Sequence, residues 1–225
     1  MNSAPTSNQV SAGWRTYGEE VINSVTHGTG CVLAIAGAMA LLATARHQAD
    51  AWYTASCAIY GTSLVAVYAF STLSHAVQQP RLKHVFRILD QAFIYVFIAG
   101  TFTPFALVYL RGGMWMLLFA VMWGIALTGF FSKVIWAHRV NAVAMPIYLL
   151  LGWLPILSGW SLIGIVPSVC LWWMLAGGLC YTIGTIFLVN DRRVRFFHAA
   201  WHMLVIAGST CHFVGIYAYL VPPVA

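Results

Sequence analysis

Long apolar runs separated by short polar breaks organise this sequence from about residue 22 to residue 221. Each run can supply the roughly 20 apolar residues that one helix needs to cross a bilayer. The pattern predicts seven membrane-spanning helices, with approximate limits 22–45, 52–77, 88–110, 114–132, 142–160, 165–189 and 197–221. We therefore expect an all-α integral membrane protein. Residues 21–225 would form one seven-helix bundle, preceded by a polar cytosolic segment at residues 1–20.

Composition agrees with a chain embedded in a membrane. Hydrophobic residues make up 61% of the sequence and charged residues 7%, whereas soluble domains carry roughly 25% charged residues. Seven spans use about 140 residues, so no room is left for a separate soluble domain. The formal charge of +6 could suggest nucleic acid, but the basic residues are spread singly over the polar breaks. This distribution favours a topology signal over a nucleic-acid-binding face.

The basic residues divide unevenly between the two sides of the predicted membrane. Those on the side of the N-terminus are Arg15, Arg81, Lys83, Arg87, Lys133, Arg139, Arg192, Arg193 and Arg195. Only Arg46 and Arg111 lie on the other side. Because cytosolic loops of membrane proteins are enriched in Lys and Arg, we expect a cytosolic N-terminus and, after seven spans, a C-terminus outside.

Ionisable side chains inside membrane spans are costly and often functional. Five of them, His27, His75, Asp90, His198 and His202, lie near the ends of four predicted spans. With the predicted topology, each of these ends is the cytosolic one. The residues should therefore lie at a similar depth in the membrane, although they are far apart in the sequence.

The spacing of the histidines indicates a metal site. His198 and His202 are four residues apart, so on a helix they share one face and lie about 6 Å apart along the axis. His75 from a neighbouring helix would complete three imidazole ligands, and an open fourth position is typical of catalytic zinc. Ser71, one helical turn before His75, can orient a ligand or polarise a carbonyl. Asp90 can hold the zinc-bound water and accept its proton.

Each of these residues also has a simpler explanation. Two interfacial histidines can extend their rings towards water, and the dipole of a helix favours Asp90 near its N-terminus. Taken together, His75, Asp90, His198 and His202 favour the metal site, since all four lie at one depth. The role of His27 stays open: it either supports the metal ligands or serves helix packing.

Four stretches of the sequence carry a resemblance to a known family. They are Glu20-Val-Ile-Asn-Ser-Val-Thr-His27-Gly, Ser71-Thr-Leu-Ser-His75, Leu89-Asp90-Gln with Ile98-Ala-Gly-Thr-Phe-Thr-Pro104, and His198-Ala-Ala-Trp-His202. Together they resemble the haemolysin III family, the bacterial branch of the progestin and adipoQ receptor superfamily, over residues 17–221.

The resemblance implies a seven-helix bundle in the bacterial inner (plasma) membrane, with zinc near its cytosolic face. The implied zinc ligands are His75, His198 and His202. The resemblance also implies that Asp90 contacts the metal through water and that Ser71 is catalytic or supports the ligands.

Eukaryotic relatives resemble metal-dependent lipid amide hydrolases, which makes a zinc hydrolase of lipid amides or esters one hypothesis. Membrane lipids would then be its partners. A second hypothesis is a non-enzymatic regulator or sensor of membrane state with a structural zinc. Direct pore formation is less favoured, because a haemolysin that inserts into foreign membranes is normally secreted, whereas this chain has the spans of a resident protein.

Overall fold

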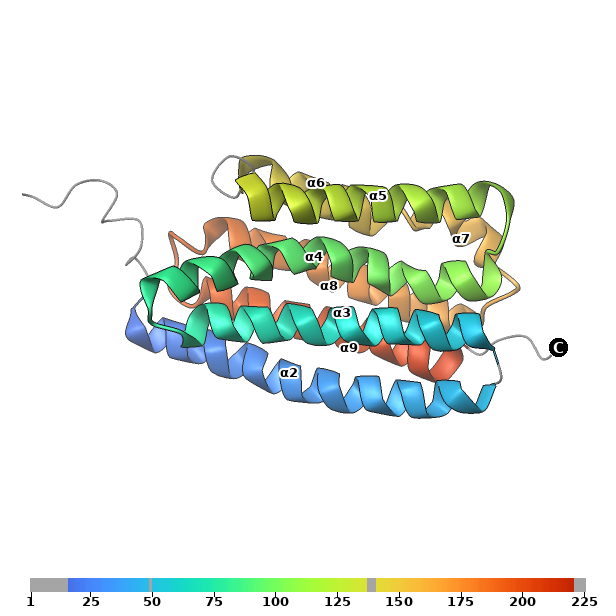
Figure 1. Ribbon diagram of the computed structural model, residues 1–225, viewed down its shortest axis with the longest axis horizontal. Helices are drawn as coiled ribbons and strands as arrows, with labels where there is room; N and C mark the ends of the chain where they lie inside the picture. The colour runs from blue at the N-terminus through green and yellow to red at the C-terminus, as the bar shows by residue number, and fades with distance from the viewer. Residues whose placement is uncertain (1–15, 49, 137–140, 221–225) are drawn as a thin grey trace, which may run out of the picture.

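The protein is a bundle of long antiparallel helices in the computed structural model, which describes residues 16–48, 50–136 and 141–220 (Figure 1). Its elements are α2 (Tyr17–Ala45), the 3-10 helix η1 (Arg46–Gln48), α3 (Ala51–Ala76), α4 (Pro80–Tyr109), α5 (Gly113–Trp136), α6 (Asn141–Trp153), α7 (Ile156–Leu162), α8 (Ser168–Asn190) and α9 (Phe197–Tyr219). Over the described residues, seven spans are long and apolar enough to cross a membrane. The prediction of an all-α, seven-span protein is confirmed.

Two helices begin earlier than the hydrophobic pattern predicts. Thr16 and Glu19 form a capping box, in which each side chain accepts a hydrogen bond from the other residue's backbone N–H, so α2 begins at Tyr17. The last four residues of the predicted N-terminal segment, 17–20, are therefore helical. The predicted break at 78–87 is wrong from Pro80 onwards, since proline suits the first turn of α4. His84 is consequently an exposed helix residue and not a loop residue.

Two further limits differ from the prediction. Helix α5 continues past residue 132 to Trp136. Lys133 is buried there, and its Nζ donates a 2.8 Å hydrogen bond to Gln91 Oε1 on α4. The fifth span is divided into α6 and α7 at Leu154 and Pro155. Proline has no N–H to continue the helical hydrogen-bond ladder, so the chain turns there before α7 begins.

The spans pack in a closed arrangement. Neighbours in sequence lie side by side from α2 to α5, α8 pairs with α9, and α9 returns to pack on α2 (Figure 1). Helix α4 is the most buried span, and every residue from 99 to 108 is buried. At Gly30 of α2 an added Cβ would lie 2.7 Å from the Tyr68 ring of α3. Glycine at this position therefore lets the two helices approach closely.

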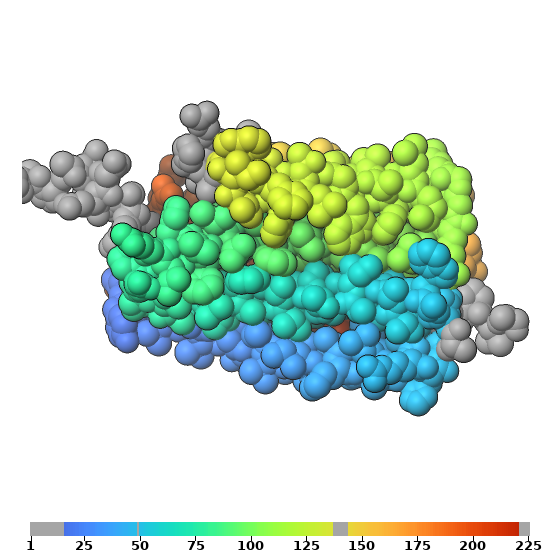
Figure 2. All heavy atoms as spheres, in the orientation of Figure 1, coloured from blue at the N-terminus to red at the C-terminus, as the bar shows by residue number. Residues whose placement is uncertain are grey.

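The outer surface is apolar. Atoms of α2, α3, α4 and α5 together cover one long side of the molecule (Figure 2). Large apolar side chains exposed on two of these helices are Val32, Leu33 and Met39 of α2 and Leu117 and Phe131 of α5. Apolar surface on this scale is typical of helices that face lipid.

The two ends of the bundle differ in charge. We call the end at which α2 begins the basic end; it also contains the start of α4, the end of α5 and the turn between α8 and α9 (Figure 1). Of the nine basic residues predicted there, Arg15 and Arg139 lie outside the described residues. Arg46 and Arg111 lie at the opposite end. That the basic end faces the cytosol stays a prediction.

Two features mark the opposite end. Asp50 caps α3 and pairs with Arg111 at 2.6 Å. Burial opposes the ionisation of Asp50, but hydrogen bonds from Arg111 and from the first backbone N–H groups of α3 outweigh it and lower the pKa of Asp50.

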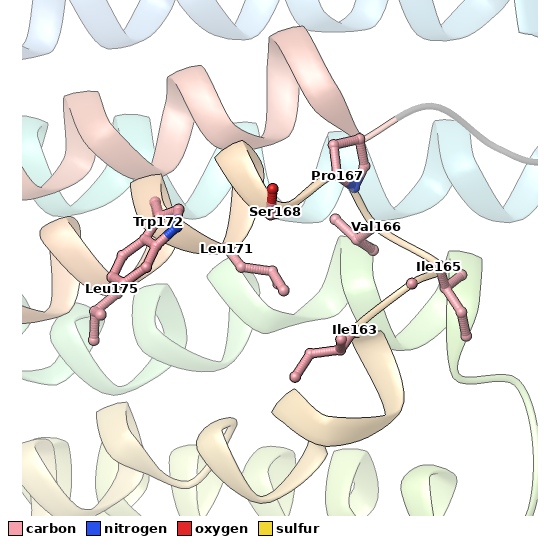
Figure 3. A pocket seen from close by; sticks show the side chains of 9 residues that line it. Ile163, Ile165, Val166, Pro167, Ser168, Leu171, Trp172 and Leu175 are labelled. Carbon is pink, nitrogen blue, oxygen red and sulfur yellow. The ribbon is translucent and has the colours of Figure 1, made fainter.

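An open apolar groove of about 770 Å³ lies nearby, lined by residues 163–168 and the first turns of α8 (Figure 3). Its lining carries no ionisable side chain.

Candidate metal centre

Three histidines from two helices converge at the basic end of the bundle. His75 lies in the last turn of α3, while His198 and His202 lie in the first turns of α9. One ring nitrogen from each lies within 4.8 Å of the other two, in a group that can hold a metal ion. A tetrahedral zinc site holds its ligand nitrogens about 3.3 Å apart, given Zn–N bonds of about 2.0–2.1 Å. A short movement of the side chains would therefore bring the three nitrogens into a coordinating arrangement.

The start of α9 is fixed by a contact with α2. Phe196 precedes α9 in a left-handed backbone conformation with φ of 63°, which is unfavourable for a bulky residue. Its N–H donates a 3.2 Å hydrogen bond to the Glu19 carboxylate. This contact joins the first turns of α2 and α9 and so helps to place His198 and His202 in the bundle.

Two carboxylates hold two of the three rings. The Nδ1 atom of His75 lies 3.1 Å from Glu20 Oε2, and the Nδ1 atom of His198 lies 2.8 Å from Asp191 Oδ2. Each carboxylate accepts a hydrogen bond from Nδ1–H, which leaves Nε2 of the same ring with a lone pair for a metal. The Nε2 atom of His75 is buried and has no hydrogen-bond partner among the described residues. These observations fit a metal that is held by the Nε2 atoms of His75 and His198.

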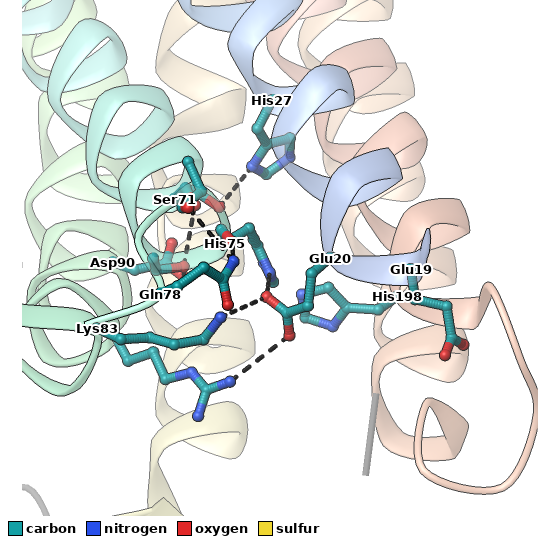
Figure 4. Close-up of polar contacts among 12 residues, drawn as sticks. Glu19, Glu20, His27, Ser71, His75, Gln78, Lys83, Asp90 and His198 are labelled. Atoms are coloured by element: carbon teal, nitrogen blue, oxygen red, sulfur yellow. Dashed lines mark hydrogen bonds and ion pairs between the residues drawn. The ribbon is translucent and has the colours of Figure 1, made fainter. Parts of the chain in front are cut away.

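Cations surround the Glu20 carboxylate. Lys83 Nζ lies 2.9 Å from Glu20 Oε2, and Arg87 lies 3.6 Å from Glu20 Oε1 (Figure 4). Both cations come from the first turns of α4. They favour the ionised form of Glu20, which can only accept hydrogen bonds. The proton shared with His75 therefore stays on Nδ1.

Ser71 and His27 form a pair beside the three histidines. The Oγ atom of Ser71 and the Nδ1 atom of His27 are joined by a hydrogen bond of 2.6 Å (Figure 4). The His27 ring stacks on the His202 ring, with centroids 3.5 Å apart and an angle of 17° between the planes. The sequence leaves the role of His27 open, and the structure places it in contact with a candidate ligand.

Asp90 lies on the α4 side of the cluster (Figure 4). Its Oδ2 accepts a 3.2 Å hydrogen bond from Ser74, the residue before His75. Asp90 does not belong to the group of three histidines that can share a metal. Its contact with the metal through water therefore stays a prediction.

The hydrophobic pattern does not indicate two carboxylates of the site. Glu20 falls in the predicted polar N-terminal segment and Asp191 in a predicted polar break, since neither lies in an apolar run. For Glu20 a signal was present, because Glu20, Asn23 and His27 are three and four residues apart and so share one helix face. All three are buried on α2. For Asp191 we find no comparable signal, because it lies in a turn outside any helical register.

Comparison with known proteins shows similarity over most of this chain. The family model described as haemolysin-III related matches residues 15–213. Hemolysin-3 of Bacillus cereus is 35% identical over 204 residues, which cover 91% of this chain and 93% of the relative. The Hemolysin-3 homolog of Bacillus subtilis (strain 168) is 34% identical over 206 residues, which cover 92% and 96%.

A human protein is also similar. Monocyte to macrophage differentiation factor of Homo sapiens is 29% identical over 210 residues, which cover 90% of this chain and 84% of the human protein. No solved structure matches the chain. Because the family model and the two bacterial relatives cover nearly all of its length, this multi-pass membrane protein belongs to the haemolysin III family.

Proposed function

We propose that this protein binds zinc in the plasma membrane, with its basic end in the cytosol, and hydrolyses an amide or ester bond of a membrane lipid. The supporting observation is the group of His75, His198 and His202, in which His75 and His202 are buried and His198 is half-buried, and two of whose rings are held by carboxylates. Three neutral imidazoles leave one coordination position open, as in catalytic zinc sites.

The position of the cluster favours a lipid substrate. The three histidines lie on membrane-spanning helices within the first or last turns at one end. In a bilayer this depth is close to the boundary between headgroups and acyl chains, where amide and ester bonds of lipids are found. A lipid can therefore present such a bond to the cluster without leaving the membrane.

Each group around the cluster has a proposed part in the reaction. Bound zinc would supply a Lewis acid for the substrate carbonyl and lower the pKa of a coordinated water molecule. Glu20 and Asp191 keep the Nδ1 protons of His75 and His198 in place. Ser71 offers a hydroxyl next to the cluster, and Asp90 offers a carboxylate on its α4 side to take up a proton.

Metal analysis of the purified protein tests the site. Wild type should carry one zinc ion per chain, and His198→Ala should lose it. His47→Ala is the matched control, because His47 is exposed on η1 at the opposite end and its loss should leave the zinc content unchanged. Absence of zinc from folded wild type, after purification without chelators, would count against the proposal.

A turnover assay tests the reaction. Wild type in lipid nanodiscs should cleave a fluorescent ceramide, phospholipid or acyl amide, and Asp90→Asn should keep its zinc while losing turnover. Wild type that holds zinc and cleaves none of these substrates would refute the hydrolase.

A regulator with structural zinc is the alternative, and the links between helices favour it. The cluster and its carboxylates connect α2, α3, α9 and the turn after α8, so a metal bound there would fasten one end of the bundle. Asp90→Ala separates the two functions. A regulator should keep both zinc and its effect in cells, whereas a hydrolase should keep zinc and lose its effect.

A further inference from the structure

His27 lies inside the bundle between α3 and α9 and is 5% exposed. On one side its Nδ1 atom meets the Ser71 hydroxyl, and its ring covers the ring of His202. On another side it meets the edge of the Tyr68 ring, with centroids 5.1 Å apart. The Tyr68 hydroxyl is in turn hydrogen bonded to Ser209 of α9.

Ser71 differs from the other buried serines of α3. Ser56, Ser63 and Ser74 each donate a hydrogen bond of 2.8–2.9 Å to the backbone carbonyl three residues earlier. This local bond is the usual one for a serine inside a helix. The hydrogen bond of Ser71 is instead made with His27, 44 residues away in sequence. The hydroxyl of Ser71 is therefore directed by α2 and not by its own helix.

The ring stack constrains His202. An imidazole can rotate about its last side-chain torsion, which has a broad energy profile. A second ring lying parallel to it at 3.5 Å blocks that rotation, because turning His202 would drive its edge into His27. The stack therefore limits the plane of His202 from α2, which supplies no ligand of the group itself.

We propose that His27 is a positioning residue of the metal centre, which directs the Ser71 hydroxyl through its hydrogen bond and fixes the His202 ring through stacking. This inference rests on the proposed metal site. Neither effect requires His27 to coordinate the metal, and a nitrogen of His27 is absent from the group that can share one ion. Packing alone would predict that any ring of similar size could replace His27 without consequence.

Two substitutions separate the two contacts. His27→Phe keeps a flat ring against His202 and removes the bond to Ser71. His27→Asn keeps a polar atom near the position of Nδ1 and removes the stack. The readouts are zinc affinity by chelator competition and the visible spectrum of the protein loaded with Co²⁺, which reports ligand geometry. Thr29→Ala, at an exposed position on the same helix, is the control.

The proposal makes different predictions for the two variants. His27→Asn should shift the Co²⁺ spectrum and weaken zinc binding by about 10–100-fold, as does loss of other groups that support a ligand. His27→Phe should keep the wild-type spectrum. Its effect on unfolding temperature should not add to that of Ser71→Ala, because each variant removes the same hydrogen bond. A wild-type spectrum and affinity in folded His27→Asn would overturn the stacking role.

A separate result would refute the proposed role of the hydrogen bond between His27 and Ser71. Strictly additive effects of His27→Phe and Ser71→Ala on the unfolding temperature would overturn it. Failure of the metal site itself looks different from either result. In that case wild type would take up no stoichiometric Zn²⁺ or Co²⁺, or His75→Ala would bind them as wild type does.

Discussion

Replacing Glu20 by glutamine tests whether the carboxylates support the metal ligands. Glutamine has nearly the same shape but no charge, so Lys83 at 2.9 Å and Arg87 at 3.6 Å lose their anion. Its side-chain amide can also turn its NH₂ group towards the two cations or towards His75, where an NH₂ group accepts no hydrogen bond. The acceptor at 3.1 Å from His75 Nδ1 is then no longer fixed.

The expected magnitudes follow from burial. Lys83 is 14% exposed and the Glu20 side chain 9% exposed, whereas Arg87 is 37% exposed. A hydrogen bond to a charged group contributes about 1.5–3 kcal/mol when buried, and the more exposed Arg87 pair adds at most about 1 kcal/mol. We therefore expect Glu20→Gln to lose about 2–4 kcal/mol of unfolding free energy. Zinc affinity should fall by about 10–100-fold, as is typical when a ligand loses its hydrogen-bond partner.

The assay is chelator competition for zinc, together with thermal unfolding in the same detergent. Asp50→Asn is the control, because it breaks the ion pair with Arg111 at the opposite end without touching the histidines. Asp50→Asn should change the unfolding temperature and leave zinc affinity unchanged. Wild-type zinc affinity in Glu20→Gln would refute the reasoning, even if the variant were less stable.

Three other predictions concern separate parts of the bundle. Asp191→Asn should weaken zinc binding about as much as Glu20→Gln, because Asp191 holds His198 at 2.8 Å; chelator competition measures it. Tyr60→Phe should raise unfolding free energy by about 1–3 kcal/mol, because the Tyr60 hydroxyl is buried without a partner among the described residues; a lower unfolding temperature would contradict this. The lowered pKa of Asp50 means that its stabilising contribution is present above the pKa of the unfolded chain. That contribution should disappear as pH falls through the lower folded value, and Asp50→Asn should remove this part of the acid dependence of the unfolding temperature.

The hydrophobic pattern was sufficient to predict the number and order of the spans, because a bilayer imposes a minimum length on an apolar helix. It failed where a helix continues beyond the apolar run. Pro80 starts α4 well before its apolar part, and the polar residues that follow include Lys83, which is bound to Glu20. Hydropathy assigns such residues to a loop, since it registers their polarity but not their partner.

Residue spacing predicted the group of His75, His198 and His202, since a four-residue repeat puts two side chains on one helix face and a common depth allows a third from another helix to join them. The groups that hold these rings required knowledge of the packing. Glu20 reaches His75 from α2, and the approach of α2 depends on contacts such as that of Gly30 with Tyr68. The helix face that Glu20 shares with Asn23 and His27 indicates burial, but no local motif shows that Glu20 meets His75.

The source of each contact indicates how the centre assembles. The candidate ligands come from α3 and α9, but α2 carries Glu20, which holds His75, and His27, which covers His202. The Glu19 side chain of α2 also accepts a hydrogen bond from the N–H of Phe196, which lies at the start of α9. Before α2 packs, the three imidazoles would therefore lack much of the support that orients them, and zinc affinity and the docking of α2 should be thermodynamically coupled. Substitutions at the interface of α2 with α3 and α9 should lower zinc affinity even when they lie several residues from the histidines.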